Sequence, residues 1–262
     1  MTPSAEAKAI AGEIDRIVEI CLAAHEVILP YWQTELEVEA KDDESPVTLA
    51  DKAANNTIVA ALKMLTPEVP IVSEEGHRHP LENENDLFWL VDPLDGTKSF
   101  IKGLDEFTVN IALVENRHPV LGVLGVPARG LVYKAAIGQG AWRKEINETD
   151  WQSIQVSPRP QDGIRVVSSR SHRSPKLVEW LQNNGVPVKE RVAAGSALKF
   201  GLVAEGLADL YPRIGPTMEW DTAAGHCLIE AAGGIMTDLN GEPFLYGKQG
   251  YLNGGFVVRG SR

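Results

Sequence analysis

Apolar residues recur at helical spacing near the start of the chain. Ile10, Ile14, Ile17 and Cys21 follow one another in steps of three or four, which predicts an amphipathic helix over residues 4–29. The same patterning predicts the other elements of this half: a polar, acidic loop over 33–46, a helix over 49–65, a short strand at 71–72, a polar irregular segment over 76–86, and a buried strand over 88–91.

A β-rich section follows, and then the rhythm changes. Apolar runs at 107–114, 120–126 and 131–137 are separated by turn-forming residues, so we expect an antiparallel meander. From residue 164 onward strands and helices alternate, which is typical of an α/β arrangement. The predicted order is strand 164–167, helix from 175 to Gly185, strand 186–192, helix 196–205, strand 207–211, helix 221–232, and strands near Ile235 and Phe256.

The segment 157–163 is rich in proline and polar residues and marks the expected domain boundary. The predicted fold class is therefore mixed, α/β and α+β. An N-terminal α+β domain over 1–160 precedes a C-terminal α/β domain over 161–262, and the candidate chemistry below makes the first the metal-site domain and the second the substrate-binding domain.

Composition narrows the possible partners. The chain has 262 residues, 44% of them apolar, and a formal net charge of -11. That charge disfavours a broad electrostatic surface for nucleic acid polymers, but a local metal can still attract a small anion. Cys21 and Cys227 lie in apolar, helix-like surroundings and are predicted to be buried free thiols. We find no signal peptide and no membrane-spanning run, so the expected location is the cytoplasm. Peripheral attachment to the inner membrane and the oligomeric state stay open.

The candidate chemistry begins where the strand over 88–91 ends. The next six residues are Asp92, Pro93, Leu94, Asp95, Gly96 and Thr97. Two carboxylates three residues apart at the end of a buried strand are costly unless a positive charge lies between them. Gly96 permits close approach of a ligand to the backbone, and the amides of Gly96 and Thr97 at a helix start would suit a phosphate. This layout indicates a hard-cation site facing a phosphate.

Further carboxylates follow apolar segments or open predicted helices. Asp51 lies near the start of the helix over 49–65, Glu74 and Glu75 follow the strand at 71–72, and Asp221 opens the helix over 221–232. Carboxylate oxygens are ligands for Mg²⁺, Mn²⁺ and Ca²⁺, and no His or Cys set suits Zn²⁺. Each of these carboxylates also has a purely structural interpretation. Asp51 would form a capping box with Thr48, Asp221 would interact favourably with the helix dipole, and the two glutamates would lie in a solvated turn. Spacing alone does not show that they converge.

Three separated motifs resemble the signatures of the inositol monophosphatase superfamily: Glu74-Glu75, Asp92-Pro-Leu-Asp95-Gly-Thr97, and Trp220-Asp221-Thr-Ala-Ala-Gly. Further stretches are similar to one branch, the bacterial 3'(2'),5'-bisphosphate nucleotidases of the CysQ type: 45–51, 98–110, 169–172, 195–200 and 210–213. The similarity runs from about residue 10 to residue 258. One departure is Ala197, which stands where a second serine is expected after Ser196.

This resemblance implies a layered αβαβα sandwich of the inositol monophosphatase and fructose-1,6-bisphosphatase type. It implies an Mg²⁺-dependent, lithium-sensitive phosphatase that converts adenosine 3',5'-bisphosphate to AMP and phosphate during sulfate assimilation, with 3'-phosphoadenylyl sulfate as a further expected substrate. Two or three Mg²⁺ ions are implied, with Mn²⁺ as a substitute and Li⁺ and Ca²⁺ as inhibitors.

The resemblance also assigns roles to residues. The implied metal ligands are Glu74, Asp92, the Leu94 carbonyl, Asp95 and Asp221. Asp51 and Thr97 are implied to orient or deprotonate the attacking water, with Glu75 supporting a metal-bound water. The implied substrate contacts are Glu74, Leu94, Asp95, Gly96, Thr97, His172, Ser196, Lys199, Arg213 and Asp221.

Other functions stay open at this point. An inositol-phosphate or fructose-bisphosphate phosphatase on the same fold would carry the same metal motifs. Lys199 and Arg213 favour a substrate with a second phosphate; the alternative interpretations are an exposed helix charge for Lys199 and a loop salt bridge for Arg213. From a different class, the chain would be a metal-binding regulator without catalysis, against which the intact water-activating pair Asp51 and Thr97 argues.

Overall fold

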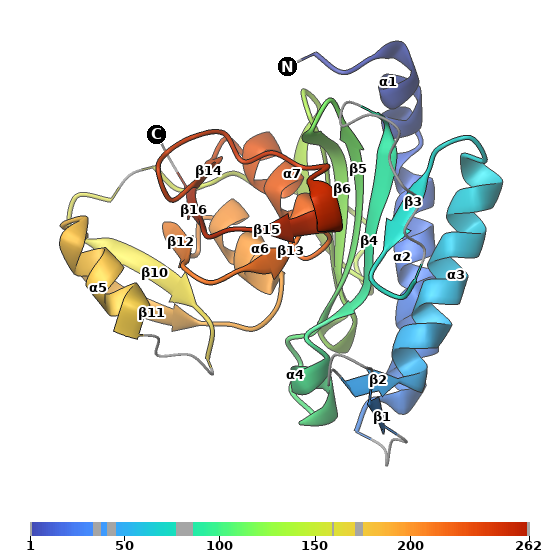
Figure 1. Cartoon of the computed structure of the whole chain (residues 1–262), viewed down its shortest axis with the longest axis horizontal. Coiled ribbons are helices and arrows are strands. Elements are labelled where there is room, and N and C mark those ends of the chain that lie inside the picture. The colour runs from blue at the N-terminus through green and yellow to red at the C-terminus, as the bar shows by residue number, and fades with distance from the viewer. Residues whose placement is uncertain are drawn as a thin grey trace.

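Two β-sheets alternate with three layers of helices in the computed structural model of the chain (Figure 1). The structure describes residues 2–33, 38–40, 46–76, 86–158, 160–170 and 175–260. One outer layer holds helices α1 to α3, a middle layer holds α6 and α7, and α5 covers the far sheet (Figure 1). The predicted αβαβα sandwich is confirmed.

The N-terminal layer consists of α1 (Ala5–Gly12), α2 (Ile14–Ile28) and α3 (Leu49–Leu65), with the 3-10 turn η1 (Leu29–Tyr31) after α2. The helix predicted over 4–29 is interrupted, because Glu13 leaves helical geometry at φ -96° and ψ 19°. The helix predicted over 49–65 is confirmed. The prediction of a loop over 33–46 was wrong in part, because β1 (Val38–Ala40) pairs antiparallel with β2 (Pro46–Thr48). Most of the predicted irregular segment 76–86 lies outside the described residues.

The first sheet has seven strands in the order β3-β4-β5-β6-β7-β8-β9. β3 runs parallel to β4, and every later pair is antiparallel, which confirms the predicted meander. β4 continues to Asp95, beyond the predicted end at residue 91, and the last two strands were not predicted. The strands are β3 (Ile71–Ser73), β4 (Phe88–Asp95), β5 (Thr108–Glu115), β6 (His118–Val126), β7 (Leu131–Ala136), β8 (Gly140–Glu145) and β9 (Gln152–Ser153), with η2 (Pro127–Arg129) after β6.

The second sheet has five strands in the order β11-β10-β12-β16-β14. β10 is parallel to both neighbours, whereas β16 is antiparallel to β12 and β14, so the sheet is mixed. Its elements are β10 (Ile164–Ser168), α5 (Pro175–Asn183), β11 (Val188–Ala193), α6 (Leu198–Ala204), β12 (Leu210–Arg213), α7 (Ala223–Ala231), β14 (Ile235–Asp238) and β16 (Phe256–Arg259). A separate pair, β13 (Thr217–Met218) and β15 (Leu252–Asn253), was not predicted, and η3 (Gln249–Tyr251) precedes β15.

Helices α6 and α7 lie between the two sheets because glycines allow close packing there. A Cβ atom added to Gly225 of α7 would lie 2.3 Å from Cγ of Phe200 on α6. A Cβ atom added to Gly122 of β6 would lie 2.6 Å from the carbonyl oxygen of Ala224 on α7. The core around these helices takes residues from both sides of residue 160, for example Phe88 and Phe256. The division into two domains stays a prediction.

Two smaller expectations concern the thiols and the membrane. Cys21 and Cys227 are buried and free, as predicted. Within the described ranges, none of the helices combines the length and apolar character needed to cross a membrane.

Candidate active site

Strand β4 carries two of the predicted metal-ligating carboxylates, Asp92 and Asp95. Asp92 pairs with Asn110 and Asp95 pairs with Thr108, so three steps along β4 match two steps along β5. Side chains alternate between faces along a strand, and residues three apart normally point to opposite faces. The extra residue is a bulge that restores both carboxylates to one face. Asp92 is 1% exposed, and its Oδ1 accepts a hydrogen bond from the Leu94 amide at 3.1 Å.

The carboxylates that precede β4 in sequence reach the same edge. The Glu74 amide donates to the carbonyl of Val91 at 3.2 Å, which places Glu74 level with the end of β4. The Ser73 hydroxyl donates to Oδ1 of Asn55 at 2.7 Å and ties β3 to α3. Asp51 lies one helical turn before Asn55 on the same face, where it is 3% exposed. Its burial on the sheet-facing side directs this carboxylate toward the site.

Asp221 comes from the opposite half of the molecule. Its Oδ2 accepts hydrogen bonds from the Thr217 hydroxyl at 2.7 Å and from the Met218 amide at 3.0 Å. Helix α7 begins at Ala223, with Thr222 as its N-cap, so the prediction that Asp221 opens the helix was wrong by two residues. The carboxylate is held by the turn before the helix and faces the cavity described below.

These carboxylates are close enough to perturb one another. The pKa of Asp92 is raised well above its usual range by burial and by the charges of Glu74, Asp95, Asp221 and Asp51. Burial and the charge of Asp221 raise the pKa of Asp95 to about 6. Burial also raises the pKa of Asp221, against the hydrogen bonds that it accepts. The convergence that spacing did not show is therefore present in the fold.

The chemistry of this cluster fits a hard divalent cation. Carboxylate oxygens prefer such ions, and desolvated carboxylates that repel each other are costly without one. Asn110 faces the cluster opposite Asp92, is 1% exposed, and has no hydrogen-bond partner for its side-chain nitrogen or oxygen among the described residues. Within those same ranges no three Asp, Glu, His or Cys side chains form a closed cage as they stand. Their roles as metal ligands stay a prediction.

The turn after Asp95 joins the carboxylates to the other half of the chain. Helix α4 (Thr97–Ile101) follows Asp95, with Gly96 as its N-cap at φ 92°. The Thr97 hydroxyl donates to the Leu94 carbonyl at 3.3 Å. A Cβ atom added to Gly96 would lie 2.0 Å from Oγ of Ser196, so only glycine fits at this position.

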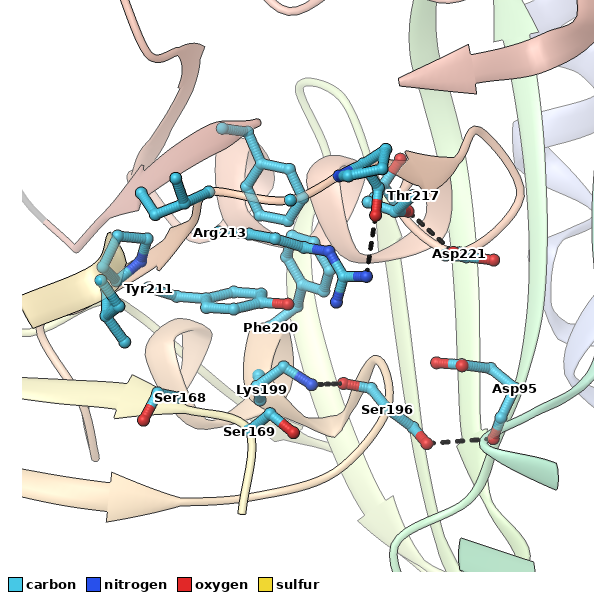
Figure 2. Close-up of a pocket in the computed structure, with 17 residues that line it drawn as sticks. Asp95, Ser168, Ser169, Ser196, Lys199, Phe200, Tyr211, Arg213, Thr217 and Asp221 are labelled. Atoms are coloured by element: carbon cyan, nitrogen blue, oxygen red, sulfur yellow. Dashed lines mark hydrogen bonds between the residues drawn. The ribbon is translucent and has the colours of Figure 1, made fainter. Parts of the chain in front are cut away.

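A cavity of about 450 Å³ opens beside this turn. Asp95 and Asp221 lie on one side of it and face Lys199 and Arg213 on the other (Figure 2). The Arg213 guanidinium donates to the Pro216 carbonyl at 3.0 Å. Lys199 is 4% exposed, and its ammonium lies 5.3 Å from the ring centroid of Tyr211. Burial lowers the pKa of Lys199 to about 8. The cavity thus places cations opposite carboxylates, at a size that suits a small phosphorylated molecule.

Most of the predicted site residues lie in or beside this cavity. Asp95, Ser196, Lys199, Arg213 and Asp221 line it. Asp51, Glu74 and Asp92 lie behind its carboxylate side, and Leu94 and Gly96 form the adjoining turn. Glu75 follows Glu74 and is not among the residues that line the cavity. His172 lies outside the described residues.

Sequence reasoning missed several lining residues, namely Ser168, Thr217 and Tyr211. Ser168 directly follows a predicted strand and Tyr211 lies in a stretch already noted for Arg213, but nothing in their spacing marks them as site residues. These three residues come together only in the folded chain.

Comparison with known proteins identifies the family. The family model described as the inositol monophosphatase family matches residues 12–257. The chain belongs to the inositol monophosphatase family. Its members are metal-dependent phosphatases that generally use Mg²⁺.

Individual relatives point to one branch. The chain is 43% identical over 249 residues to the 3'(2'),5'-bisphosphate nucleotidase CysQ of Escherichia coli (strain K12), covering 94% of this chain and 98% of that protein. It is 31% identical over 252 residues to the protein of the same name from Haemophilus influenzae, covering 95% and 93%. The crystal structure of CysQ from Bacteroides thetaiotaomicron superposes with a TM-score of 0.82 at 37% identity, covering 96% and 98%. The predicted resemblance to the CysQ type is confirmed.

Proposed function

We propose that this protein is an Mg²⁺-dependent 3'(2'),5'-bisphosphate nucleotidase that hydrolyses adenosine 3',5'-bisphosphate to AMP and phosphate, with 3'-phosphoadenylyl sulfate as a further substrate. The observation that carries the proposal is the pair of cations, Lys199 and Arg213, facing Asp95 and Asp221 across one cavity. A substrate with one phosphate needs a metal side only, whereas a bisphosphate also needs positive charge at a second position. The 43% identity to a nucleotidase supports the same choice.

The residues that would hold the metal are Glu74, Asp92, Asp95, Asp221 and the Leu94 carbonyl. When bound, Mg²⁺ would supply the positive charge that polarises a phosphate and lowers the pKa of a bound water. The number of ions is proposed as two or three, with Mn²⁺ as a substitute and Li⁺ and Ca²⁺ as inhibitors.

Residues of the chain itself are assigned the activation of the attacking water and the binding of the second phosphate. Asp51 and Thr97 are proposed to orient the attacking water and accept its proton, with Glu75 in support. The bulge at Asp92 and Asp95 holds the carboxylates on one face, so the reacting phosphate meets them from the cavity. Lys199 and Arg213 bind the phosphate that is not hydrolysed, with Ser196 beside them.

We also propose that the protein acts in the cytoplasm, where sulfate assimilation would produce the substrate.

Phosphate release from a panel of substrates tests the proposal. The panel contains adenosine 3',5'-bisphosphate, 3'-phosphoadenylyl sulfate, inositol 1-phosphate and fructose 1,6-bisphosphate, each with Mg²⁺ and Li⁺ titrated in parallel. We expect the highest kcat/KM for the first, no turnover after chelation of the metal, and inhibition by Li⁺. A preference for inositol 1-phosphate would instead assign the chain an inositol monophosphatase activity.

A further inference from the structure

Glu106 is a buried carboxylate to which the reaction described above gives no role. It lies between α4 and β5 in the N-terminal half and is 3% exposed. A charged group this deeply buried requires partners. Two guanidinium groups supply them: Arg170 donates to Oε1 of Glu106, and Arg129 lies 3.6 Å from the same oxygen.

The two arginines come from different parts of the fold. Arg129 follows β6 in the same half as Glu106, and it also bonds Asp105 through two nitrogens at 3.2 Å. Arg170 lies just after β10 in the C-terminal half, 64 residues from Glu106, and also donates to the Ala193 carbonyl at 3.5 Å. The Glu106–Arg170 pair therefore connects the two halves, whereas Arg129 connects Glu106 only to its own half.

Arg170 is continuous with one wall of the cavity. Ser168 and Ser169 immediately precede it and line the cavity. The Ala194 amide donates to the Ser168 carbonyl at 3.1 Å, so this wall is joined to the segment that leads to Ser196. Fixing Arg170 thus fixes the backbone on which both wall segments depend.

Glu106 also touches the second wall segment directly. A Cβ atom added to Gly195 would lie 3.0 Å from Cβ of Glu106 and 3.1 Å from its Oε2. Gly195 precedes Ser196, and Lys199 follows one turn later. The Ala197 amide completes this attachment by donating to the Thr108 hydroxyl at 3.3 Å.

We propose that Glu106 is a positioning residue: through Arg170 and through its contact with Gly195 it fixes the cation-bearing wall, 168–170 and 195–199, against the carboxylate side of the cavity. Glu106 itself does not line the cavity, so it acts on substrate binding through other residues. The inference rests on the proposed function insofar as Lys199 binds the second phosphate. Burial lowers the pKa of Lys199, and the charge of Glu106 opposes that shift, so the same carboxylate also favours a charged Lys199.

The chain offers matched variants for a test. Arg170→Gln removes the bridge between the halves from a side chain that is 57% exposed, so this variant is expected to fold. Arg129→Gln removes a partner of the same carboxylate within its own half. Glu106→Gln keeps the shape of the side chain but removes its charge. Lys189→Gln breaks an exposed ion pair with Asp162 elsewhere in the C-terminal half and serves as a control for the loss of any surface pair.

Two measurements are made on each variant of the full chain. The first is hydrogen exchange of the amides over 193–198 without ligand, which does not depend on any activity. We expect Arg170→Gln and Glu106→Gln to speed this exchange, and the other two variants to leave it unchanged. The second is the kinetics with adenosine 3',5'-bisphosphate, where we expect the first two variants to raise KM roughly tenfold, the scale of one charge-assisted contact, with little change in kcat.

The outcomes separate this inference from the proposed function. If wild-type protein does not turn over the bisphosphate, the proposed function fails, while the exchange data still decide whether Glu106 fixes the wall. If Arg129→Gln and Arg170→Gln have equal effects in both measurements, Glu106 is merely a neutralised buried charge and the inference is overturned. A loss of kcat at unchanged KM in Arg170→Gln, or unchanged exchange over 193–198, would overturn it as well.

Discussion

The side-chain hydroxyl of Ser196 donates a hydrogen bond to the backbone carbonyl of Asp95 at 3.0 Å, across 101 residues of sequence. Ser196 itself has left-handed backbone at φ 48°, and Gly96, which follows Asp95 at the end of β4, has φ 92°. A serine in that region carries strain that the surrounding structure must hold in place. This contact fixes the position of the cation-bearing side of the cavity relative to the carboxylates (Figure 2).

Replacing Gly96 by alanine should abolish this arrangement. The added Cβ atom would meet Oγ of Ser196 at 2.0 Å, so one of the two turns must move. We expect a loss of about 100-fold in kcat/KM, because a displacement of about 1 Å at a site has effects of that size. Gly138→Ala is the matched control, because it has φ 80° but nothing within 4 Å of the added atom. It should lose about 1 kcal/mol of stability and no activity. Equal activity of the two variants would show that the contact has no role.

Neutralising Asp92 should have opposite effects on stability and on activity. Its pKa is raised by burial and by four neighbouring carboxylates, so Asp92→Asn removes repulsion and should raise the melting temperature without metal. The same change should abolish turnover and remove the stabilisation that millimolar Mg²⁺ gives the wild type. Thermal unfolding with chelator and with Mg²⁺ measures both effects. Asp162→Asn, an exposed carboxylate in an ion pair, is the control and should alter neither response. Retained turnover in Asp92→Asn would disprove the metal assignment.

Substrate capture should weaken above about pH 8. Burial lowers the pKa of Lys199 to about 8, so its ammonium group is present below that pH and lost as pH rises through it. We expect kcat/KM for adenosine 3',5'-bisphosphate to fall about tenfold in total over this range, since kcat/KM reports the free enzyme and one charged contact is lost. Lys199→Arg keeps its charge and should give a flat profile. Parallel falls in the wild type and in Lys199→Arg would assign the pH dependence to another group.

Hydrophobic patterning predicted the elements that bury one continuous face. The helix over 49–65 and the meander of β5 to β7 match the structure closely because each has a clear period and strong turn signals. The break at Glu13 was missed, since the apolar spacing continues across it. The strand containing Asp92 was cut short, because two acidic residues look like the end of a strand unless a bulge and a buried site are anticipated.

The candidate site was predictable to the extent that its chemistry is local. Asp92, Asp95 and Gly96 follow one another along the chain, and their motif marked them. Glu106 and Arg170 lie within the stretches 98–110 and 169–172 that resemble the CysQ type, but neither was assigned a role, because their pairing depends on how two distant halves pack. A single charged residue in a polar turn gives no sequence signal that it will be buried.

His25 should make the fold sensitive to acid. It lies on α2 at 1% exposure, with Nε2 3.6 Å from Sγ of Cys21 and close to Gly125 of β6, where an added Cβ atom would lie 2.0 Å away. Burial lowers its pKa from 6.5 to about 4, so the folded state holds it neutral. The stability that neutral His25 contributes is therefore complete above about pH 6.5 and is lost as pH falls toward 4. Since a tenfold change in proton affinity corresponds to about 1.4 kcal/mol, this contribution is about 3 kcal/mol. The raised pKa values of Asp92 and Asp95 act with the opposite sign in every variant, so the contribution of His25 is the difference between the wild type and His25→Gln in urea unfolding at pH 7 and pH 4.5. On acidification His25→Gln should lose less stability than the wild type, by most of this amount, whereas the half-buried His118→Gln should behave like the wild type. An equal change of stability in the wild type and in His25→Gln would assign the acid sensitivity to another group.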